Sequence, residues 1–93
     1  MYEWDEAKRE QNLRKHGLDF WAAHLVYESP EKVTTRLKSK LEERFLDVAL
    51  VELRGAILAL VYTNRNGNVR FISFRHASRK ERRRYAAAQT RYD

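Results

Sequence analysis

The residues best suited to chemistry stand where a predicted strand gives way to a predicted helix. Phe74-Arg75-His76 ends an apolar run, and Arg79 and Lys80 follow shortly after it. Guanidinium and ammonium groups stabilise charge that develops on a phosphate, and histidine can move protons. The free N–H groups at the start of a helix add positive potential. This spacing indicates a phosphate-handling site built on Arg75, His76, Arg79 and Lys80.

RNA is the phosphodiester that suits such a site. Because RNA carries its own nucleophile, the 2′-OH, an enzyme needs only to orient that group, move protons and neutralise the charge of the phosphorane. DNA lacks this internal nucleophile. Simpler roles stay open at this stage. Arg75 could have no role beyond an ion pair with Glu43 or Asp47 on a neighbouring strand. His76 could have no role beyond a backbone hydrogen bond.

Other chemistries find no support in the sequence. The chain has no Cys, which excludes a disulfide framework, a thiolate zinc site and a cysteine nucleophile. Its histidines are His16, His24 and His76, and no two of them have the H-x-x-x-H spacing of a metal site. Three glycines could hardly build a phosphate-cradling loop. We expect no metal and no cofactor, and we expect His24 to be packed or exposed rather than catalytic.

Positive charge gathers at the C-terminal end of the chain. The 93 residues carry 19 Lys and Arg against 13 Asp and Glu, a net charge of +6. Residues 75–93 hold seven of these cations and two anions, a balance of +5, so residues 1–74 contribute only +1. Clustered cations attract polyanions and release counterions from phosphates. The asymmetry favours a nucleic acid or an acidic protein as partner, although a solvated Arg-rich helix is the simpler alternative.

Two helices are predicted at the start of the chain. Asp5 can cap a helix over residues 6–15, a stretch without Gly, Pro or β-branched residues, and His16-Gly17 ends it. Asp19 can cap a second, shorter helix that stops at Ser29-Pro30. A cation near a helix C-terminus is favourable, so His16 could have this structural role alone.

Strand-like sequence fills the middle of the chain. Asn64-Arg65-Asn66-Gly67 is the clearest hairpin signal, because Asn and Gly tolerate positive φ. Ser78 and Glu81 have the spacing of a capping box at the start of a last helix, residues 79–90. The order ααββββα indicates one α+β domain, residues 1–93, with a four-stranded antiparallel meander and helices packed on one face. The expected strands cover residues 33–37, 44–51, 57–63 and 69–74.

The sequence predicts neither a membrane span nor an export signal. No apolar run approaches the ~20 residues that a span needs. Residues 1–5 are acidic where a signal peptide would be basic. We therefore expect a soluble protein in the cytoplasm.

Six short motifs, taken in their order along the chain, carry a resemblance to a known family. They are Trp4-Asp5-Glu6-Ala7-Lys8, Asn12-Leu13-Arg14-Lys15-His16-Gly17, Glu42-Glu43-Arg44-Phe45, Val61-Tyr62-Thr63, Arg70-Phe71-Ile72-Ser73-Phe74-Arg75 and Ala77-Ser78-Arg79-Lys80-Glu81-Arg82-Arg83-Arg84-Tyr85. In this order the chain resembles BrnT-type toxins of bacterial toxin–antitoxin pairs. The resemblance implies a small RelE-like fold, an endoribonuclease that arrests translation, and a BrnA-type antitoxin that neutralises it. It also implies that the toxin–antitoxin complex represses its own operon through the antitoxin's DNA-binding element.

The resemblance implies roles for individual residues. In RelE-like folds cleavage relies on basic residues along the sheet and the last helix rather than on a histidine pair. One departure is visible, since a Gly often follows the apolar run of the second strand and Ala49-Leu50-Val51-Glu52 continues it here; this affects the turn more than the chemistry. We expect charge stabilisation from Arg75, Arg79 and Lys80, proton transfer by His16, Glu43 or His76, and RNA binding by Lys15, Arg44, Arg70, Arg82 and Arg83.

The leading hypothesis is a metal-independent endoribonuclease toxin, held inactive by an antitoxin that covers its basic surface. The alternative is a non-catalytic binding module whose basic last helix docks a nucleic acid or an acidic protein.

Overall fold

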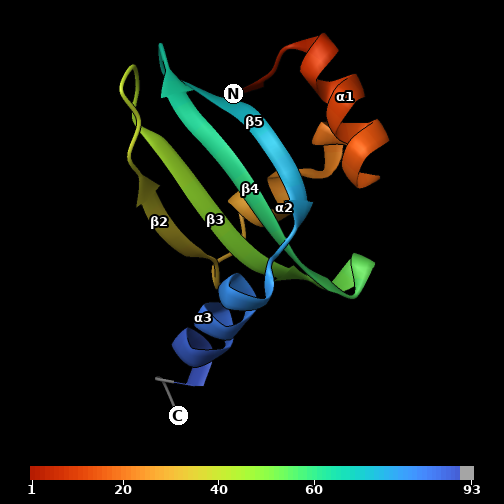
Figure 1. Cartoon of the computed structure of the whole chain (residues 1–93), viewed down its shortest axis with the longest axis vertical. Helices are drawn as coiled ribbons and strands as arrows, with labels where there is room; N and C mark the ends of the chain where they lie inside the picture. Colours follow the sequence, from red (N-terminus) through yellow and green to blue (C-terminus); the bar gives the residue numbers. More distant parts are fainter. Residues whose placement is uncertain (91–93) are drawn as a thin grey trace.

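The structure is a computed structural model that describes residues 1–90, so Arg91, one of the C-terminal cations, lies outside the described residues. A sheet with the strand order β1-β5-β4-β3-β2 forms the centre of the fold (Figure 1). The α+β class is confirmed. The elements are β1 (Tyr2–Glu3), α1 (Glu6–His16), η1 (Phe20–Ala22), α2 (His24–Tyr27), β2 (Val33–Leu37), β3 (Arg44–Val51), η2 (Glu52–Arg54), β4 (Ala56–Arg65), β5 (Asn68–His76) and α3 (Arg79–Thr90).

The expected four-stranded antiparallel sheet is wrong in one respect, because β1 adds a fifth strand parallel to β5. Tyr2 pairs with Val69, and Glu3 pairs with Arg70. The Val69 N–H donates to the carbonyl of Met1 at 2.9 Å. Two residues are too few to show the period-two alternation by which a strand is found in a sequence.

The helix caps predicted from the sequence are confirmed. The Asp5 carboxylate accepts the Ala7 N–H at 2.8 Å, and Gly17 has the left-handed conformation with φ 70°. The single helix expected after Asp19 is wrong, since a 3₁₀ turn precedes the short α2. Phe20, Ala23 and Val26 recur every third residue and are fully buried. A 3₁₀ turn has three residues per turn, so beginning with one helps to keep this row on the sheet.

The predicted antiparallel pairing of the four strands β2, β3, β4 and β5 is confirmed. Strands β2 and β3 have the expected bounds, and β4 and β5 are longer than expected. Asn66 (φ 52°) and Gly67 (φ 79°) form the predicted tight turn between β4 and β5. A register shift follows, because Val61 pairs with Ser73 and Tyr62 with Phe71. This bulge leaves Ile72 of β5 without a partner on β4.

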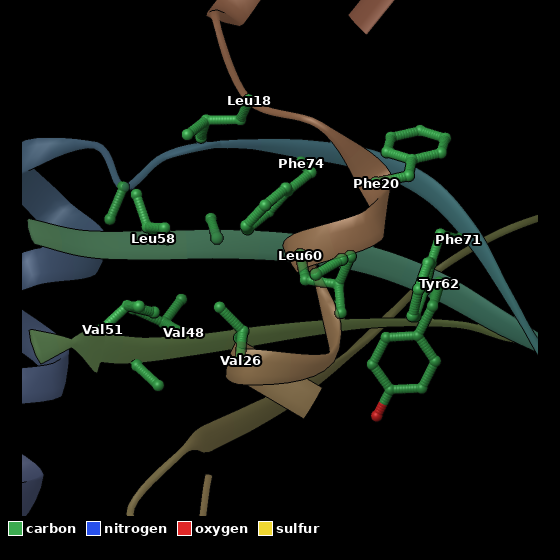
Figure 2. Packing of buried hydrophobic residues seen from close by; sticks show 14 of the residues in the cluster. Leu18, Phe20, Val26, Val48, Val51, Leu58, Leu60, Tyr62, Phe71 and Phe74 are labelled. Carbon is green, nitrogen blue, oxygen red and sulfur yellow. The ribbon is translucent and has the colours of Figure 1, made fainter. Parts of the chain in front are cut away.

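One face of the sheet, the α2 face, carries the main hydrophobic core. Leu60 and Phe74 pair across β4 and β5 on this face, and Phe20 and Val26 cover them from η1 and α2. Figure 2 shows the Phe20 and Phe71 rings at one end of the cluster and Leu58 towards the end nearer α3.

The opposite face, the α3 face, is covered at one end by the last helix. Val33, Val48 and Ala59 share a register row on this face, and Val33 lines a small hollow with Ala87 and Ala88 of α3. Figure 1 shows α3 at the end of the sheet where β3 finishes. The expectation that all helices pack on one face is therefore wrong. Placing α3 here leaves the rest of this face open.

Candidate active site

A buried amide fixes α1 against the edge of β5. The Asn12 Nδ2 donates to the Phe74 carbonyl at 2.7 Å and to the Leu18 carbonyl at 3.0 Å, while its Oδ1 accepts the Phe74 N–H at 3.0 Å. The side chain thus takes the place of a paired strand beyond the end of β1. Because both backbone groups of Phe74 are held, the last turn of α1 has a defined position beside the bulge and the end of β5.

A polar pocket, the α1–β5 pocket, opens at this junction. Its volume is about 210 Å³. The predicted residues Lys15 and His16 line it together with two residues that sequence reasoning missed, Lys8 and Ser73. Lys8 precedes Lys15 by seven residues, which is two helical turns, so this spacing could have revealed it. Ser73 reaches the pocket through the bulge, and no sequence signal marks the bulge.

His16 lies among cations in this pocket and is half-buried. Burial lowers the pKa of its imidazole below the ordinary value, and the positive charges of Lys15, Arg75 and His76 lower it further. Lys15 and His16 line one pocket, whereas Arg75 and His76 do not line it, and His76 lines a separate hollow with Arg82. A half-buried imidazole that stays neutral near pH 7 is suited to accept a proton.

Arg75 forms an ion pair that the sequence did not predict. Its Nη1 lies 2.8 Å from Oε1 of Glu81 and its Nη2 lies 3.0 Å from Oε2, so neither Glu43 nor Asp47 is its partner. The same carboxylate accepts the Ser78 N–H at 2.8 Å, and the Ser78 hydroxyl accepts the Glu81 N–H at 3.2 Å. The capping box is thus confirmed, and the hydrogen bonds from Arg75 lower the pKa of Glu81 to about 2.

The ion pair leaves one edge of the Arg75 guanidinium available. Nη1 also donates to the His76 carbonyl at 3.3 Å, so both of its protons are used. Within residues 1–90, Nε and the second proton of Nη2 have no hydrogen-bond acceptor. These two donors lie side by side and can bind two oxygens of a phosphate.

The first turns of α3 add exposed cations next to the end of β5. Arg79, Lys80 and Arg83 are exposed, and no carboxylate of the described part of the chain forms an ion pair with them. Arg82 donates from Nη1 to the Ala77 carbonyl at 2.8 Å. It also lines a hollow of about 420 Å³ with the exposed His76. The cations of α3 therefore continue the positive surface from the end of β5.

Arg44 and Arg70 lie on the same face but at the other end of the sheet. Thr63 of β4 pairs with Arg70 of β5. On the other side of β4, Phe45 pairs with Tyr62, so the next residue of β3, Arg44, lies beside Thr63. Arg44 pairs with Glu42 at 3.1 Å, and Arg70 with Glu3 at 2.9 Å.

A half-buried row of Leu46, Val61 and Ser73 separates this end from Arg75. Arg70 pairs with Thr63 and Arg75 pairs with Ala59, so the two ends lie four residues apart along β4. Four residues of a strand span roughly 13 Å. Glu43 lies just outside β3 at the Arg44 end and pairs with Arg36 at 3.2 Å. The structure therefore does not bring Glu43 together with His16.

His24 and Asp47 have structural roles. His24 contacts the Trp21 carbonyl through Nδ1 at 3.0 Å. Asp47 is fully buried on the α2 face, where it accepts the Thr34 hydroxyl at 2.6 Å and pairs with Lys32 at 2.8 Å.

Residues 1–90 contain neither a metal-binding cluster nor a membrane-spanning helix. No group of three or more His, Asp or Glu side chains in this range could hold a metal ion. No helix in the same range is long and apolar enough to cross a membrane.

Comparison with known protein families gives a match over most of the chain. A family model described as the ribonuclease toxin, BrnT, of type II toxin–antitoxin systems matches residues 4–81. In a comparison with curated proteins, no sequence matches this chain.

Proposed function

Since this chain belongs to the BrnT family of ribonuclease toxins of type II toxin–antitoxin systems, we propose that it is a metal-independent endoribonuclease whose active site is the α1–β5 pocket. The family implies an RNA target and an antitoxin partner. The observation that carries the proposal is the position of His16, half-buried in this pocket beside Lys15, with a pKa that burial and nearby cations lower.

The proposed reaction uses the 2′-OH of the RNA as nucleophile. Neutral His16 takes the proton of this hydroxyl, and the oxygen forms a bond to the adjacent phosphorus. The bond from phosphorus to the 5′ oxygen of the next nucleotide then breaks, and His76 gives that oxygen a proton. The products are a 2′,3′-cyclic phosphate and a free 5′-OH.

Cations stabilise the extra negative charge of the phosphorane. The free edge of Arg75 provides two parallel donors, already oriented by Glu81. Lys15 lines the same pocket as His16 and provides an ammonium group. Arg79 and Lys80 extend the positive field from α3.

The α3 face binds the rest of the RNA in this proposal. Arg70 and Arg44 position the strand at the far end of the open sheet face, and Arg82 and Arg83 bind phosphates along α3. Glu43 lies at the Arg44 end, so we assign proton transfer to the two histidines.

The proposed partner is a BrnA-type antitoxin that covers the basic surface, and its own DNA-binding element would let the complex repress the operon. The proposed place of action is the cytoplasm, where the RNA substrate is translated.

The test is expression of the chain alone and then together with the antitoxin encoded beside it. We expect growth arrest and fragmented RNA with the chain alone, and protection when the antitoxin is present. His16→Ala should remove the cleavage. Purified chain should cleave RNA in EDTA, and loss of cleavage in EDTA that a divalent ion restores would refute metal independence.

The second candidate is a binding module without catalysis, favoured by the exposed cations of α3. In that case His16→Ala would leave growth arrest unchanged, whereas charge removal at Arg79 and Lys80 would abolish it.

A further inference from the structure

A second concave surface, the aromatic groove, lies on the other face of β5. Phe71 lines this groove, whereas Ser73 lines the α1–β5 pocket, and the register places these two residues on opposite faces of the sheet. The groove has a volume of about 580 Å³. Its aromatic lining consists of Tyr2, Trp4, Phe20, Trp21 and Phe71.

The aromatic rings of the groove pack against one another, and the Trp21 side chain stays exposed to solvent. The Trp4 ring stacks on Phe71 with centroids 5.9 Å apart, and Trp21 packs edge-on against Trp4 at 4.8 Å. Trp21 is nevertheless 68% exposed. Exposed, rigidly held tryptophan is the residue type that most often dominates the energy of protein–protein interfaces.

The charges around the groove do not suit a nucleic acid. Glu3 lines the groove and pairs with Arg70, and Glu6 accepts the indole N–H of the lining residue Trp4 at 2.9 Å. Glu6 and Asp19, the neighbour of Phe20, both pair with Arg9. No Lys or Arg of residues 1–90 lines the groove, because Arg9 is held by Glu6 and Asp19 and Arg70 lies on the α3 face. The groove therefore offers no guanidinium or ammonium group to a phosphate backbone, in contrast to the cations near His16.

One carboxylate at the groove has no cation. Glu28 accepts a hydrogen bond from the Tyr2 hydroxyl, and no Lys or Arg of residues 1–90 forms an ion pair with it. A basic side chain of a partner would complete this pair. The groove therefore matches an apolar side chain with a neighbouring Lys or Arg.

We propose that the aromatic groove is the docking site for an apolar side chain of the antitoxin, carried on a segment whose Lys or Arg reaches Glu28. The inference rests on the proposed function only for the existence of the antitoxin. The groove and the α1–β5 pocket lie on different faces of the sheet. The antitoxin therefore has an anchor outside the RNA site.

Fluorine NMR can test occupancy of the groove directly. The chain has two tryptophans, Trp4 and Trp21, and both line the groove. After labelling of the full chain with 5-fluorotryptophan, addition of the unlabelled antitoxin should shift both resonances, and an RNA oligonucleotide should shift neither. A complex that leaves both resonances in place would overturn the proposal. Shifts produced by RNA instead would also overturn it, because they would identify a nucleic acid as the occupant.

Substitutions test the two parts of the proposed contact. Trp21→Ala should weaken antitoxin binding about 30-fold or more, the effect expected of an interface hot spot. Glu28→Gln should weaken it several-fold at low salt and less at high salt. Leu53→Ala removes another exposed apolar side chain (87% exposed), and Glu10→Gln removes an exposed carboxylate; both should leave binding unchanged.

The two proposals fail in different ways. If the antitoxin shifts the tryptophan resonances but the free chain cleaves no RNA, the ribonuclease proposal fails and the groove assignment stands. If the free chain cleaves RNA and Trp21→Ala binds antitoxin normally, the groove assignment fails and the ribonuclease proposal stands.

Discussion

Arg75 and Glu81 form a two-point ion pair that ties the end of β5 to the first turn of α3, with contacts of 2.8 and 3.0 Å. The same carboxylate caps α3 through the Ser78 N–H. One pair of residues therefore orients the proposed phosphate-binding guanidinium and holds the last helix in place.

The ion pair predicts a specific loss of stability in acid. The folded-state pKa of Glu81 is lowered to about 2 from 4.5, so its contribution is present above pH 4.5 and is lost as the pH falls towards 2. Urea unfolding between pH 7 and 3 should show a steeper loss for the native chain than for Glu81→Gln. Glu10→Gln, an exposed control, should follow the native chain. Equal slopes for Glu81→Gln and the native chain would contradict this prediction.

Arg75→Lys separates the two roles of the guanidinium. An ammonium group cannot bind Glu81 at two points and also present a two-donor edge to phosphate. We expect kcat/KM for RNA cleavage to fall about 100-fold, the range seen when one donor to a transition-state oxyanion is removed. Glu81→Gln should cost less than tenfold because it leaves the guanidinium in the site. If kcat/KM falls more in Glu81→Gln than in Arg75→Lys, the ion pair matters more than the contact with phosphate, and Arg75 acts only by positioning α3.

His16 should set the acid limb of the pH–rate profile. Because its pKa is lowered, the imidazole is mostly neutral at pH 6.5, so kcat/KM should fall only at a pH below the ordinary histidine pKa. His16→Ala should reduce kcat by roughly 10²- to 10⁴-fold and remove this limb. His24→Ala is the matched control, since His24 contacts the Trp21 carbonyl outside the pocket. An unchanged acid limb in His16→Ala would exclude it as the base.

Local signals in the sequence predicted the elements well. The caps at Asp5 and Gly17, the Asn66-Gly67 turn and the Ser78–Glu81 capping box each depend on a few adjacent residues, and all are confirmed. The two-residue strand β1 and the position of α3 depend on pairing and packing between distant segments. Such contacts leave no periodic pattern in a single sequence.

The candidate site was predictable only in part for the same reason. Lys15, His16, Arg75 and His76 were expected from their types and their places at helix and strand ends; the fold brings Lys15 and His16 into one pocket and leaves His76 in a separate hollow. Glu43 has a suitable type, but the strand register places it at the other end of β3. Ser73 enters the pocket through a bulge that only the pairing of β4 and β5 reveals.

Lys8 should contribute to RNA binding although it lies far in the sequence from Arg75 and the cations of α3. It lines the α1–β5 pocket two turns before Lys15. Lys8→Ala should raise KM several-fold, leave kcat nearly unchanged and reduce the slope of log K against log salt by about 1. Lys40→Ala removes an exposed lysine of the loop between β2 and β3 and is the control. Equal effects of the two substitutions would show that Lys8 acts only through net charge.

Asn12→Asp should disturb the packing of α1 against β5 without unfolding the helix itself. The substitution keeps the shape of the side chain, but a carboxylate oxygen replaces the Nδ2 that donates to the Phe74 and Leu18 carbonyls at 2.7 and 3.0 Å. Two carbonyls then face a buried negative charge, so we expect a loss of about 3 kcal/mol or more at pH 7. Burial raises the pKa of the new carboxyl, and its protonated form can donate to one carbonyl again.

The stability defect of Asn12→Asp should therefore shrink as the pH falls, and cleavage should be lost at pH 7. Gln11→Glu adds the same charge at the exposed neighbouring position and should cost less than 0.5 kcal/mol. Chemical denaturation of both variants at pH 7 and pH 5 measures the difference. If Asn12→Asp is as stable as Gln11→Glu at pH 7, the amide does not fix α1 to β5, and the geometry of the His16 pocket must have another support.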